Sequence, residues 1–272
     1  IKSKGYSAIN IGGLAVGMAV AMIIGLWIWD ELSYDKNHKN YERIAQVMQH
    51  QTFNGEIGTQ NSNPAVLSQE IRRRFGSDFK YVLQCSWNFD HTLAYGEKKL
   101  LKSGSFIEPG VADMFSLKIL KGNGALDDPY AILLSASVAK AYFGNEDPIG
   151  KTMKMDNKVD IKVTGVYEDL PYNSTLREVG YWLPWKLYLI QNPWIEKMET
   201  PWGSNFTQTF AQIADNADMA KVSAKIKNIK YDAQTTDDKR YKPVMFLQPM
   251  KKWHLFSDFK NGINTGGRIQ YV

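Results

Sequence analysis

The sequence has very little cysteine, with Cys85 the single one among 272 residues. A lone cysteine cannot form a disulfide within the chain, so the sequence excludes a disulfide-stabilised scaffold. No catalytic pattern surrounds Cys85 that would mark it as a nucleophile. We predict that Cys85 is a small buried hydrophobic residue.

Motifs for metal, acyl-transfer and nucleotide chemistry are also missing. The four histidines show no H-E-x-x-H or other ligand spacing, and no serine lies in a G-x-S-x-G turn. Gly144 to Thr152 resembles a phosphate-binding loop, but five residues separate its glycines where the motif has four. It also follows a predicted helix, whereas a phosphate-binding loop follows a strand and opens a helix. The sequence therefore predicts a protein that is not an enzyme, with no catalytic residue, metal site or cofactor.

Basic runs interleaved with aromatic residues, which are typical of nucleic-acid-binding proteins, are absent as well. The formal net charge is +5 and the pI is about 9.0, but Lys and Arg are scattered along the chain. One short cluster, Arg72, Arg73 and Arg74, is interpreted as a solvated helix face. We predict no nucleic-acid partner.

What the sequence does contain is one long uncharged stretch, from Ala8 to Trp29. A helix of that length measures about 33 Å, against a membrane hydrocarbon core of about 30 Å. Lys2 and Lys4 precede the stretch and acidic residues follow it, so the N-terminal end is predicted to be cytoplasmic and the chain after Glu31 to lie outside the cytoplasm. Membrane lipid is then a partner.

Two other interpretations of this stretch stay open at this point. A cleaved secretory signal would have a shorter apolar run and a small-residue cleavage site, which the sequence after Trp29 does not offer. A buried helix of a soluble protein would carry polar residues at intervals, and this stretch has only Asn10. Both fit less well than a membrane helix.

Small residues recur every four positions within the stretch, at Gly13, Gly17, Ala21 and Gly25. This spacing aligns them on one helix face, where small residues let a second helix approach closely. We predict a membrane-helix packing face, with the alternative that Gly and Ala are simply common in membrane helices. The sequence holds no second span, so the partner helix must come from elsewhere.

Two β-α-β patterns occupy the two ends of the remaining chain. The first has a strand over 43–53, a helix over 65–75 and a strand over 81–89; the second has a strand over 205–215, a helix over 217–231 and a strand over 242–250. Two such units form a split β-α-β sheet with helices on one face, the ferredoxin-like arrangement. The predicted fold class is therefore α+β, with one N-terminal transmembrane helix.

The residues between the two units predict an inserted, mostly β subdomain. A hairpin turns at Gly96-Glu97, a short helix and strand follow over 111–122, and a strand leads into a helix from Ser135 to Phe143. Two further strands are separated by Asp156-Asn157, residues that favour tight turns.

Four stretches together resemble the MacB-like periplasmic core domain of ABC transporter permeases, the MacB and FtsX type. They are KGYSAINIGGLAVGMAV, DELSYDKNHKNYERI, ILLSASVAKAYFGNEDPIGK and VTGVYEDLPYNST. The residues of the last two stretches that define the motif are Phe143, Gly144, Asp147, Pro148, Gly150, Lys151, Gly165, Pro171 and Asn173. Most of them are residues that shape turns and close approaches, so we expect structural roles for them.

The resemblance implies a periplasmic core with a Porter-like subdomain over 41–90 and 204–261 and an inserted Sabre-like subdomain over 91–203. Residues 1–32 would be the transmembrane helix and its flank, and residues 262–272 a lead-in to a second transmembrane helix. The sequence starts with Ile and stops without a polar tail, which we interpret as a piece of a longer protein.

The implied function is that of a permease subunit in a bacterial inner membrane. It would couple ATP hydrolysis by a separate cytoplasmic ATPase to periplasmic movement, for export or efflux, lipoprotein or cell-envelope processes. Implied partners are a second copy of the permease, the ABC ATPase and a periplasmic adaptor protein. The alternative hypothesis is a membrane-anchored extracytoplasmic sensor or ligand-binding domain, which shares one span followed by an α+β domain.

Overall fold

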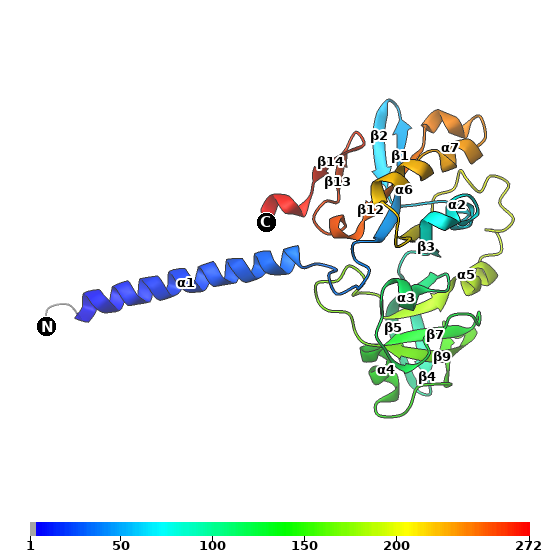
Figure 1. The fold of residues 1–272 in the computed structure, drawn as a ribbon. Helices are drawn as coiled ribbons and strands as arrows, with labels where there is room; N and C mark the ends of the chain where they lie inside the picture. Colours follow the sequence, from blue (N-terminus) through cyan, green and yellow to red (C-terminus); the bar gives the residue numbers. More distant parts are fainter. Residues whose placement is uncertain (1–3) are drawn as a thin grey trace.

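The computed structural model describes residues 4–272, so Lys2 lies outside the described residues. Its first element, α1 (Lys4–Leu32), stands away from the rest of the molecule (Figure 1). The segment Gly5–Leu32 is long and apolar enough to cross a membrane, and the remainder of the described chain buries none of its most apolar part. A helix that is apolar all round requires an apolar surrounding, which a bilayer supplies.

An antiparallel sheet lies in the upper half of Figure 1, in a region that we call the sheet lobe (residues 44–85 and 208–271). Its strands are β1 (Ile44–Phe53), β3 (Phe79–Cys85), β11 (Gln208–Ile213) and β12 (Val244–Pro249). Their order is β3-β11-β1-β12, so each predicted β-α-β unit supplies one inner and one outer strand. The short strand β2 (Glu56–Gln60) folds back on the second half of β1.

Helices cover one face of this sheet. They are α2 (Leu67–Phe75), α6 (Met219–Ile226) and α7 (Ile229–Ala233). Leu67 and Ile71 of α2 pack with Val222 of α6 in one buried cluster with the strand residues beneath them. The single helix predicted over 217–231 is wrong in one respect. It breaks after Ile226, where the carbonyl of Lys227 accepts a hydrogen bond from the Met245 N–H of β12 at 2.9 Å and leaves the helical ladder.

The other half of the domain is a region that we call the barrel lobe (residues 86–191). Six of its strands pair in a closed ring in the order β10-β7-β9-β8-β4-β5, and β5 pairs again with β10. They are β4 (Phe89–Tyr95), β5 (Lys98–Ile107), β7 (Ala131–Ser135), β8 (Thr152–Met155), β9 (Val159–Tyr167) and β10 (Tyr181–Pro184). The strand β6 (Ile119–Gly122) adds to β9 outside the ring. The helices are α3 (Val111–Met114), α4 (Ala136–Phe143) and α5 (Trp185–Gln191).

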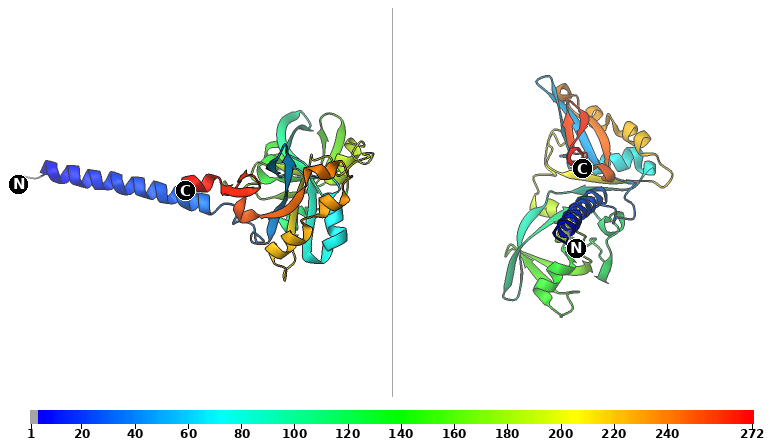
Figure 2. Two further views of the ribbon diagram at one scale, coloured as in Figure 1. Left: turned by 90° about the horizontal axis from the view of Figure 1, so that it is seen from above. Right: turned by 90° about the vertical axis from the view of Figure 1, so that its left-hand side faces the viewer.

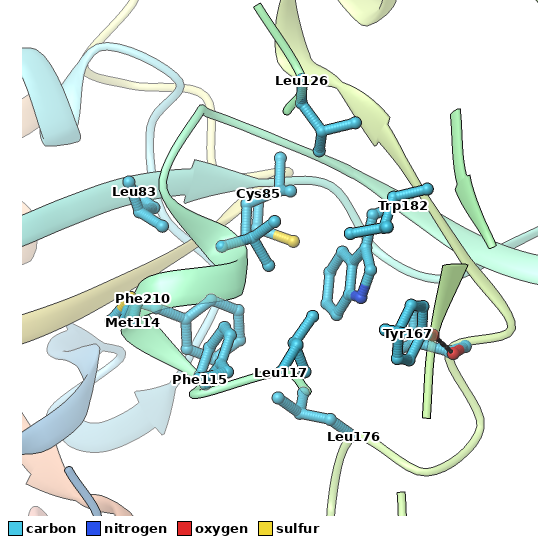
Figure 3. Packing of buried hydrophobic residues seen from close by; sticks show 14 of the residues in the cluster. Leu83, Cys85, Met114, Phe115, Leu117, Leu126, Tyr167, Leu176, Trp182 and Phe210 are labelled. Atoms are coloured by element: carbon cyan, nitrogen blue, oxygen red, sulfur yellow. Dashed lines mark hydrogen bonds between the residues drawn. The ribbon is translucent and has the colours of Figure 1, made fainter. Parts of the chain in front are cut away.

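A shared apolar core joins the two lobes (Figure 3). The ring of Phe115, which follows α3, packs edge-on against Phe210 of β11 at 5.5 Å and stacks near Trp182 of β10 at 6.3 Å. Cys85 lies in the same core with 2% of its surface exposed, as the sequence predicts, and burial raises the pKa of its thiol. A buried thiol with a raised pKa is not a nucleophile.

Several short elements have no counterpart in the sequence-based prediction. The strand expected over 81–89 ends at Cys85, and the chain turns before β4 begins at Phe89. The elements β2, β10 and α5, and the hairpin of β13 (Asp258–Lys260) and β14 (Ile263–Gly266), were not anticipated. The C-terminal segment containing this hairpin ends beside the domain-proximal part of α1 in both Figures 1 and 2.

Candidate functional site

The junction between α1 and the domain is the part of the molecule where the motif-bearing segments meet. Seen along its axis, α1 approaches between the two lobes (Figure 2). The chain leaves α1 through turns over residues 33–43 before β1 begins. That polar segment packs against the domain, since its residues Asp35 and His38 are only 1% and 2% exposed.

Asp35 is the centre of the contact with the barrel lobe. Its carboxylate accepts hydrogen bonds from the Thr175 N–H at 2.7 Å, the Thr175 hydroxyl at 2.6 Å and the Ser174 hydroxyl at 3.3 Å. Its own N–H donates to the Asn173 carbonyl at 2.8 Å. Three donors on one carboxylate compensate for its burial, and the φ of +61° is one that Asp tolerates better than most residues. Asp35 therefore fixes the end of the membrane helix to the loop between β9 and β10.

His38 makes the second contact with the barrel lobe. Its Nδ1 lies 2.6 Å from the Phe115 carbonyl and so donates to it, while Nε2 lies 3.4 Å from the Ser174 hydroxyl. Burial lowers the pKa of His38, against smaller opposing effects of the Phe115 carbonyl and of Asp35. A neutral His38 thus ties the junction to the apolar core around Phe115.

The contact of α1 with the sheet lobe is smaller. Glu31, in the last turn of α1, accepts a hydrogen bond from His254 Nε2 at 2.7 Å, and the two side chains are 14% and 10% exposed. The ring of Tyr34 stacks on His254 with centroids 3.5 Å apart. One helix end is therefore attached to both lobes.

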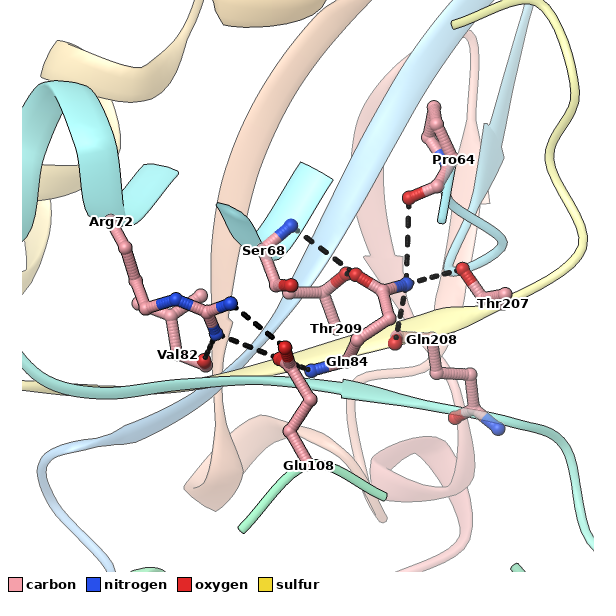
Figure 4. Close-up of polar contacts among 9 residues, drawn as sticks. All are labelled: Pro64, Ser68, Arg72, Val82, Gln84, Glu108, Thr207, Gln208 and Thr209. Carbon is pink, nitrogen blue, oxygen red and sulfur yellow. Dashed lines mark hydrogen bonds and ion pairs between the residues drawn. The ribbon is translucent and has the colours of Figure 1, made fainter. Parts of the chain in front are cut away.

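A polar brace connects the lobes on the side of α2 (Figure 4). Arg72 binds Glu108 through two hydrogen bonds of 2.7 and 2.8 Å, and Glu108 also accepts the Gln84 N–H at 2.7 Å. The Gln84 side chain is buried and accepts the Ser68 N–H at 3.2 Å. Arg72, Arg73 and Arg74 are all exposed, so the predicted solvated arginine face is confirmed, and Arg72 in addition bridges α2 to the segment after β5. A bidentate pair of this kind restricts geometry as well as adding energy.

The predicted helix-packing residues Gly13, Gly17, Ala21 and Gly25 all lie in α1, outside the folded domain. A Cβ placed on Gly13, Gly17 or Gly25 would meet nothing within 4 Å. These positions have no neighbours within the described chain, so the packing face stays a prediction.

The predicted motif around α4 lies at the end of the barrel lobe, away from the junction. Phe143 is buried at the end of α4, and Gly144 caps the helix with a φ of +60°. Gly150 has a φ of +77° and its N–H donates to the Val163 carbonyl at 2.9 Å. These positive φ values are ones that glycine adopts without strain.

The other residues of this motif are also turn residues. Asp147 is exposed and pairs with Lys121 at 3.3 Å. Pro148 is buried in the turn, and its carbonyl accepts the N–H of Lys151, whose side chain pairs with Glu146. None of these contacts assembles a set of groups suited to a reaction.

Gly165, Pro171 and Asn173 lead from the barrel to the junction. A Cβ on Gly165 would lie 2.7 Å from the Gly124 backbone nitrogen, a distance that real side chains do not show. Pro171 is exposed in the following loop. Asn173 donates to the Ser33 hydroxyl at 2.7 Å in addition to binding Asp35. Of the predicted motif residues, Asn173 alone takes part in the junction.

Sequence reasoning missed Asp35, His38 and Thr175 as residues of the junction. Two of the resembling stretches, DELSYDKNHKNYERI and VTGVYEDLPYNST, contain them, and that was the available signal. Within residues 4–272, no group of three or more His, Cys, Asp or Glu side chains could hold a metal ion. The junction links the end of one helix to two packed lobes.

The sequence matches a known protein family, and the structure resembles those of known proteins. A family model described as the MacB-like periplasmic core domain matches residues 7–229. A domain of a permease protein from Porphyromonas gingivalis has a similar structure, with a TM-score of 0.63 at 16% identity, covering 86% of this chain and 97% of that one. The periplasmic region of MacB from Actinobacillus actinomycetemcomitans has a TM-score of 0.55 at 18% identity, covering 79% and 92%. A search of curated proteins finds no match.

Proposed function

The chain belongs to the family of MacB-like periplasmic core domains of ABC transporter permeases, and we propose that it transmits ATP-driven movement of its membrane helix to two extracytoplasmic lobes. In this proposal a separate cytoplasmic ATPase moves the membrane helices of the permease. The movement then performs export, efflux, lipoprotein or cell-envelope work outside the membrane.

The observation that carries the proposal is the double attachment of α1. Asp35 and His38 tie the helix end to the barrel lobe, and Glu31 ties it to His254 of the sheet lobe. Because the helix meets the domain between the lobes, a tilt or shift of α1 acts on both attachments. Packed cores and interfaces move between discrete arrangements rather than deforming continuously, so such a shift is passed on as a lobe movement.

We assign the sheet lobe to the Porter-like subdomain, over 41–90 and 204–261, and the insert over 91–203 to the Sabre-like subdomain. The strand order β3-β11-β1-β12 with helices on one face supports a ferredoxin-like unit for the first. The closed strand ring supports an independent β subdomain for the second. Residues 262–272 then lead toward a further membrane helix.

The proposed orientation places the N-terminus in the cytoplasm and both lobes in the periplasm, with α1 in a bacterial inner membrane. The proposed assembly contains a second copy of the permease, the ABC ATPase and a periplasmic adaptor. The absence of charge from the apolar part of α1 supports the membrane position.

Distance measurement between the lobes tests the proposal. Glu56→Cys in β2 and Asn145→Cys after α4 place exposed thiols on the two lobes, and the natural Cys85 is buried and escapes labelling. Paired fluorophores on these cysteines are followed in native membranes with ATP, with ATP plus vanadate, and without nucleotide. We expect an ATP-dependent change in energy transfer, and labelling by a membrane-impermeant maleimide in cells whose outer membrane has been permeabilised.

Two variants separate the junction from general effects. Asp35→Asn should reduce the ATP-dependent change, because the amide has a single acceptor oxygen where the carboxylate accepts from the Thr175 N–H, the Thr175 hydroxyl and the Ser174 hydroxyl. Asp160→Asn breaks an exposed pair with Lys154 elsewhere in the barrel lobe and should leave the change intact. Equal behaviour of Asp35→Asn and the unsubstituted chain would contradict transmission through this junction.

A further inference from the structure

A partly open cavity of ≈ 720 Å³ lies between the two lobes. Its walls come from β1, β11 and β12 of the sheet lobe and from the 86–88 turn and the 175–182 segment of the barrel lobe. Cavities of this volume between two packed units are the usual place for small-molecule sites. Thr175 is shared between the junction and this cavity, whereas the motif residues around α4 do not line it.

Side-chain hydroxyls and side-chain amides form the polar lining. The amides are Gln46, Gln60, Asn61, Asn88, Gln208 and Gln248. Within the described residues, no Asp, Glu, Lys, Arg or His side chain lines the cavity. A charged ligand would lose hydration there without gaining an opposite charge, so the lining selects an uncharged one.

Some of these amides are already paired with each other, and others are not. Gln46 donates to Gln208 at 2.8 Å, which fixes both side chains on the sheet face. Gln248 is 6% exposed and donates through Nε2 to the Phe256 carbonyl at 2.9 Å, while its Oε1 has no hydrogen-bond partner within residues 4–272. Asn88 accepts from Ser105, and its Nδ2 likewise has no partner in that part of the chain. An acceptor from one lobe and a donor from the other are therefore available to a ligand.

Aromatic rings supply the apolar part of the lining. They are Trp87, Trp182, Trp253, Phe210 and Phe259. The indole N–H of Trp253 donates to the Gln248 carbonyl at 2.8 Å, so the polar edge of that ring is satisfied and its faces remain for apolar contact. Trp87 is 36% exposed at the barrel-lobe wall.

We propose that the cavity between the lobes binds a short, uncharged oligosaccharide. A sugar ring has apolar C–H faces, which fit against indole rings, and hydroxyl or acetamido edges, which pair with amides. An acyl chain would leave the Oε1 atom of the buried Gln248 side chain without a partner, at a cost. Access of extracytoplasmic glycans to the cavity rests on the proposed orientation of the chain. Binding of a sugar by the cavity does not depend on that orientation.

Tryptophan fluorescence of the 272-residue chain in lipid nanodiscs tests this site. The probes are N,N′-diacetylchitobiose and maltotriose, with the deacetylated chitobiose as a cationic counterpart and a short neutral peptide with both ends blocked. We expect saturable quenching by at least one of the two neutral sugars, and none by the cationic dimer. No ATPase is present, so failure here is separate from failure of ATP-driven lobe movement.

Substitutions locate the binding. Asn88→Asp keeps the acceptor for Ser105 but adds a charge, and Trp87→Ala removes an exposed ring; each should weaken sugar binding by about tenfold or more. The controls are Gln191→Glu and Trp194→Ala, an exposed amide and a 49%-exposed indole that do not line the cavity, and both should bind as the unsubstituted chain does. Absence of saturation by both sugars, binding of the blocked peptide alone, or equal weakening by the control variants overturns the proposal.

Discussion

The two attachments of α1 differ in number and in chemistry. On the barrel lobe, the Asp35 carboxylate accepts three hydrogen bonds and His38 adds one to the Phe115 carbonyl, all involving buried or half-buried groups. On the sheet lobe, a single pair between Glu31 and His254 and one stacked ring make the contact. The helix end is thus held firmly by one lobe and lightly by the other.

This asymmetry indicates which lobe follows the helix. A network in which each buried donor and acceptor is paired resists rearrangement, because breaking one bond exposes several unpaired groups. On the sheet lobe, breaking the single pair leaves only Glu31 and His254 without their partners, so the cost is smaller. We therefore expect the barrel lobe to move with α1, and the sheet lobe to change its angle to both.

Among the substitutions that test this asymmetry, Asp35→Ala should have the largest effect on stability. It leaves the Thr175 N–H and hydroxyl and the Ser174 hydroxyl without their acceptor, so we expect a loss of about 3 kcal/mol in the free energy of unfolding. Urea unfolding of the chain in nanodiscs, followed by tryptophan fluorescence, measures it.

The matched control is Asp160→Ala, which removes a 65%-exposed carboxylate paired with Lys154 at 3.3 Å. Exposed pairs of this kind contribute less than about 1 kcal/mol. Similar losses for the two variants would mean that the Asp35 network does not hold the junction.

The next effect is a pH dependence carried by His38. Its pKa is lower in the folded chain than in the unfolded one, because burial disfavours the charged ring. Between these two pKa values the unfolded state binds more protons, so stability falls as pH drops from about 6.5 toward the folded pKa and then levels off. His38→Asn supplies a donor to the Phe115 carbonyl without titrating.

The measurement compares unfolding free energies of the two chains at pH 7.5 and pH 5.5. We expect acid to destabilise the natural chain more than His38→Asn, because only the natural chain carries the titrating His38 ring. Burial also lowers the pKa of His50, but His50 is present in both chains and does not contribute to the difference. Equal pH profiles would show that protonation of His38 does not weaken the barrel-lobe attachment.

His254→Gln tests the lighter attachment and should cost about 1 kcal/mol, because it alters one hydrogen bond of a pair whose side chains are 14% and 10% exposed. It removes the stacked ring and offers Glu31 an amide N–H as donor, without disturbing the Asp35 network. Hydrogen exchange should increase in the segment after β12 and stay unchanged at Thr175. An increase at Thr175 instead would mean that the two attachments are not separate.

Local sequence patterns predicted several of the regular elements of both lobes. Two-residue alternation predicted β1, and a helix predicted from Ser135 to Phe143 and closed by Gly144 is present as α4, where the Ser135 side chain accepts from the Val138 N–H. The turn at Asp156-Asn157 is present with φ values of +52° and +55°. These elements are determined by residues that are close together in the sequence, so local sequence patterns are enough to predict them.

Elements defined by distant contacts could not be predicted in this way. β10 has only four residues, all buried, because it lies between β5 and β7 and shows no alternation. The Asp35–Thr175 contact joins residues 140 positions apart. The family resemblance marked both segments, but it gave no sign that they touch.

Substitutions on the small-residue face of α1 should have the smallest effect on the domain. They test whether α1 also makes contacts with other chains, beyond its contacts within this one. A Cβ on Gly17 meets nothing within 4 Å, and Val16, on a different helix face, is 65% exposed. Gly17→Ile should therefore leave the domain's unfolding free energy unchanged, as should Val16→Ile.

In a membrane, however, a bulky residue in the groove formed with Gly13, Ala21 and Gly25 prevents close approach of a partner helix, because association there depends on packing rather than on the hydrophobic effect. We expect Gly17→Ile to reduce crosslinked assembly and transport-dependent growth of cells carrying the full-length protein, without loss of membrane insertion, and Val16→Ile to be nearly silent. Assembly of Gly17→Ile equal to that of the natural chain would mean that this face of α1 contacts lipid, and that the junction with the two lobes is the helix's only specific contact within the part of the chain described by the structure.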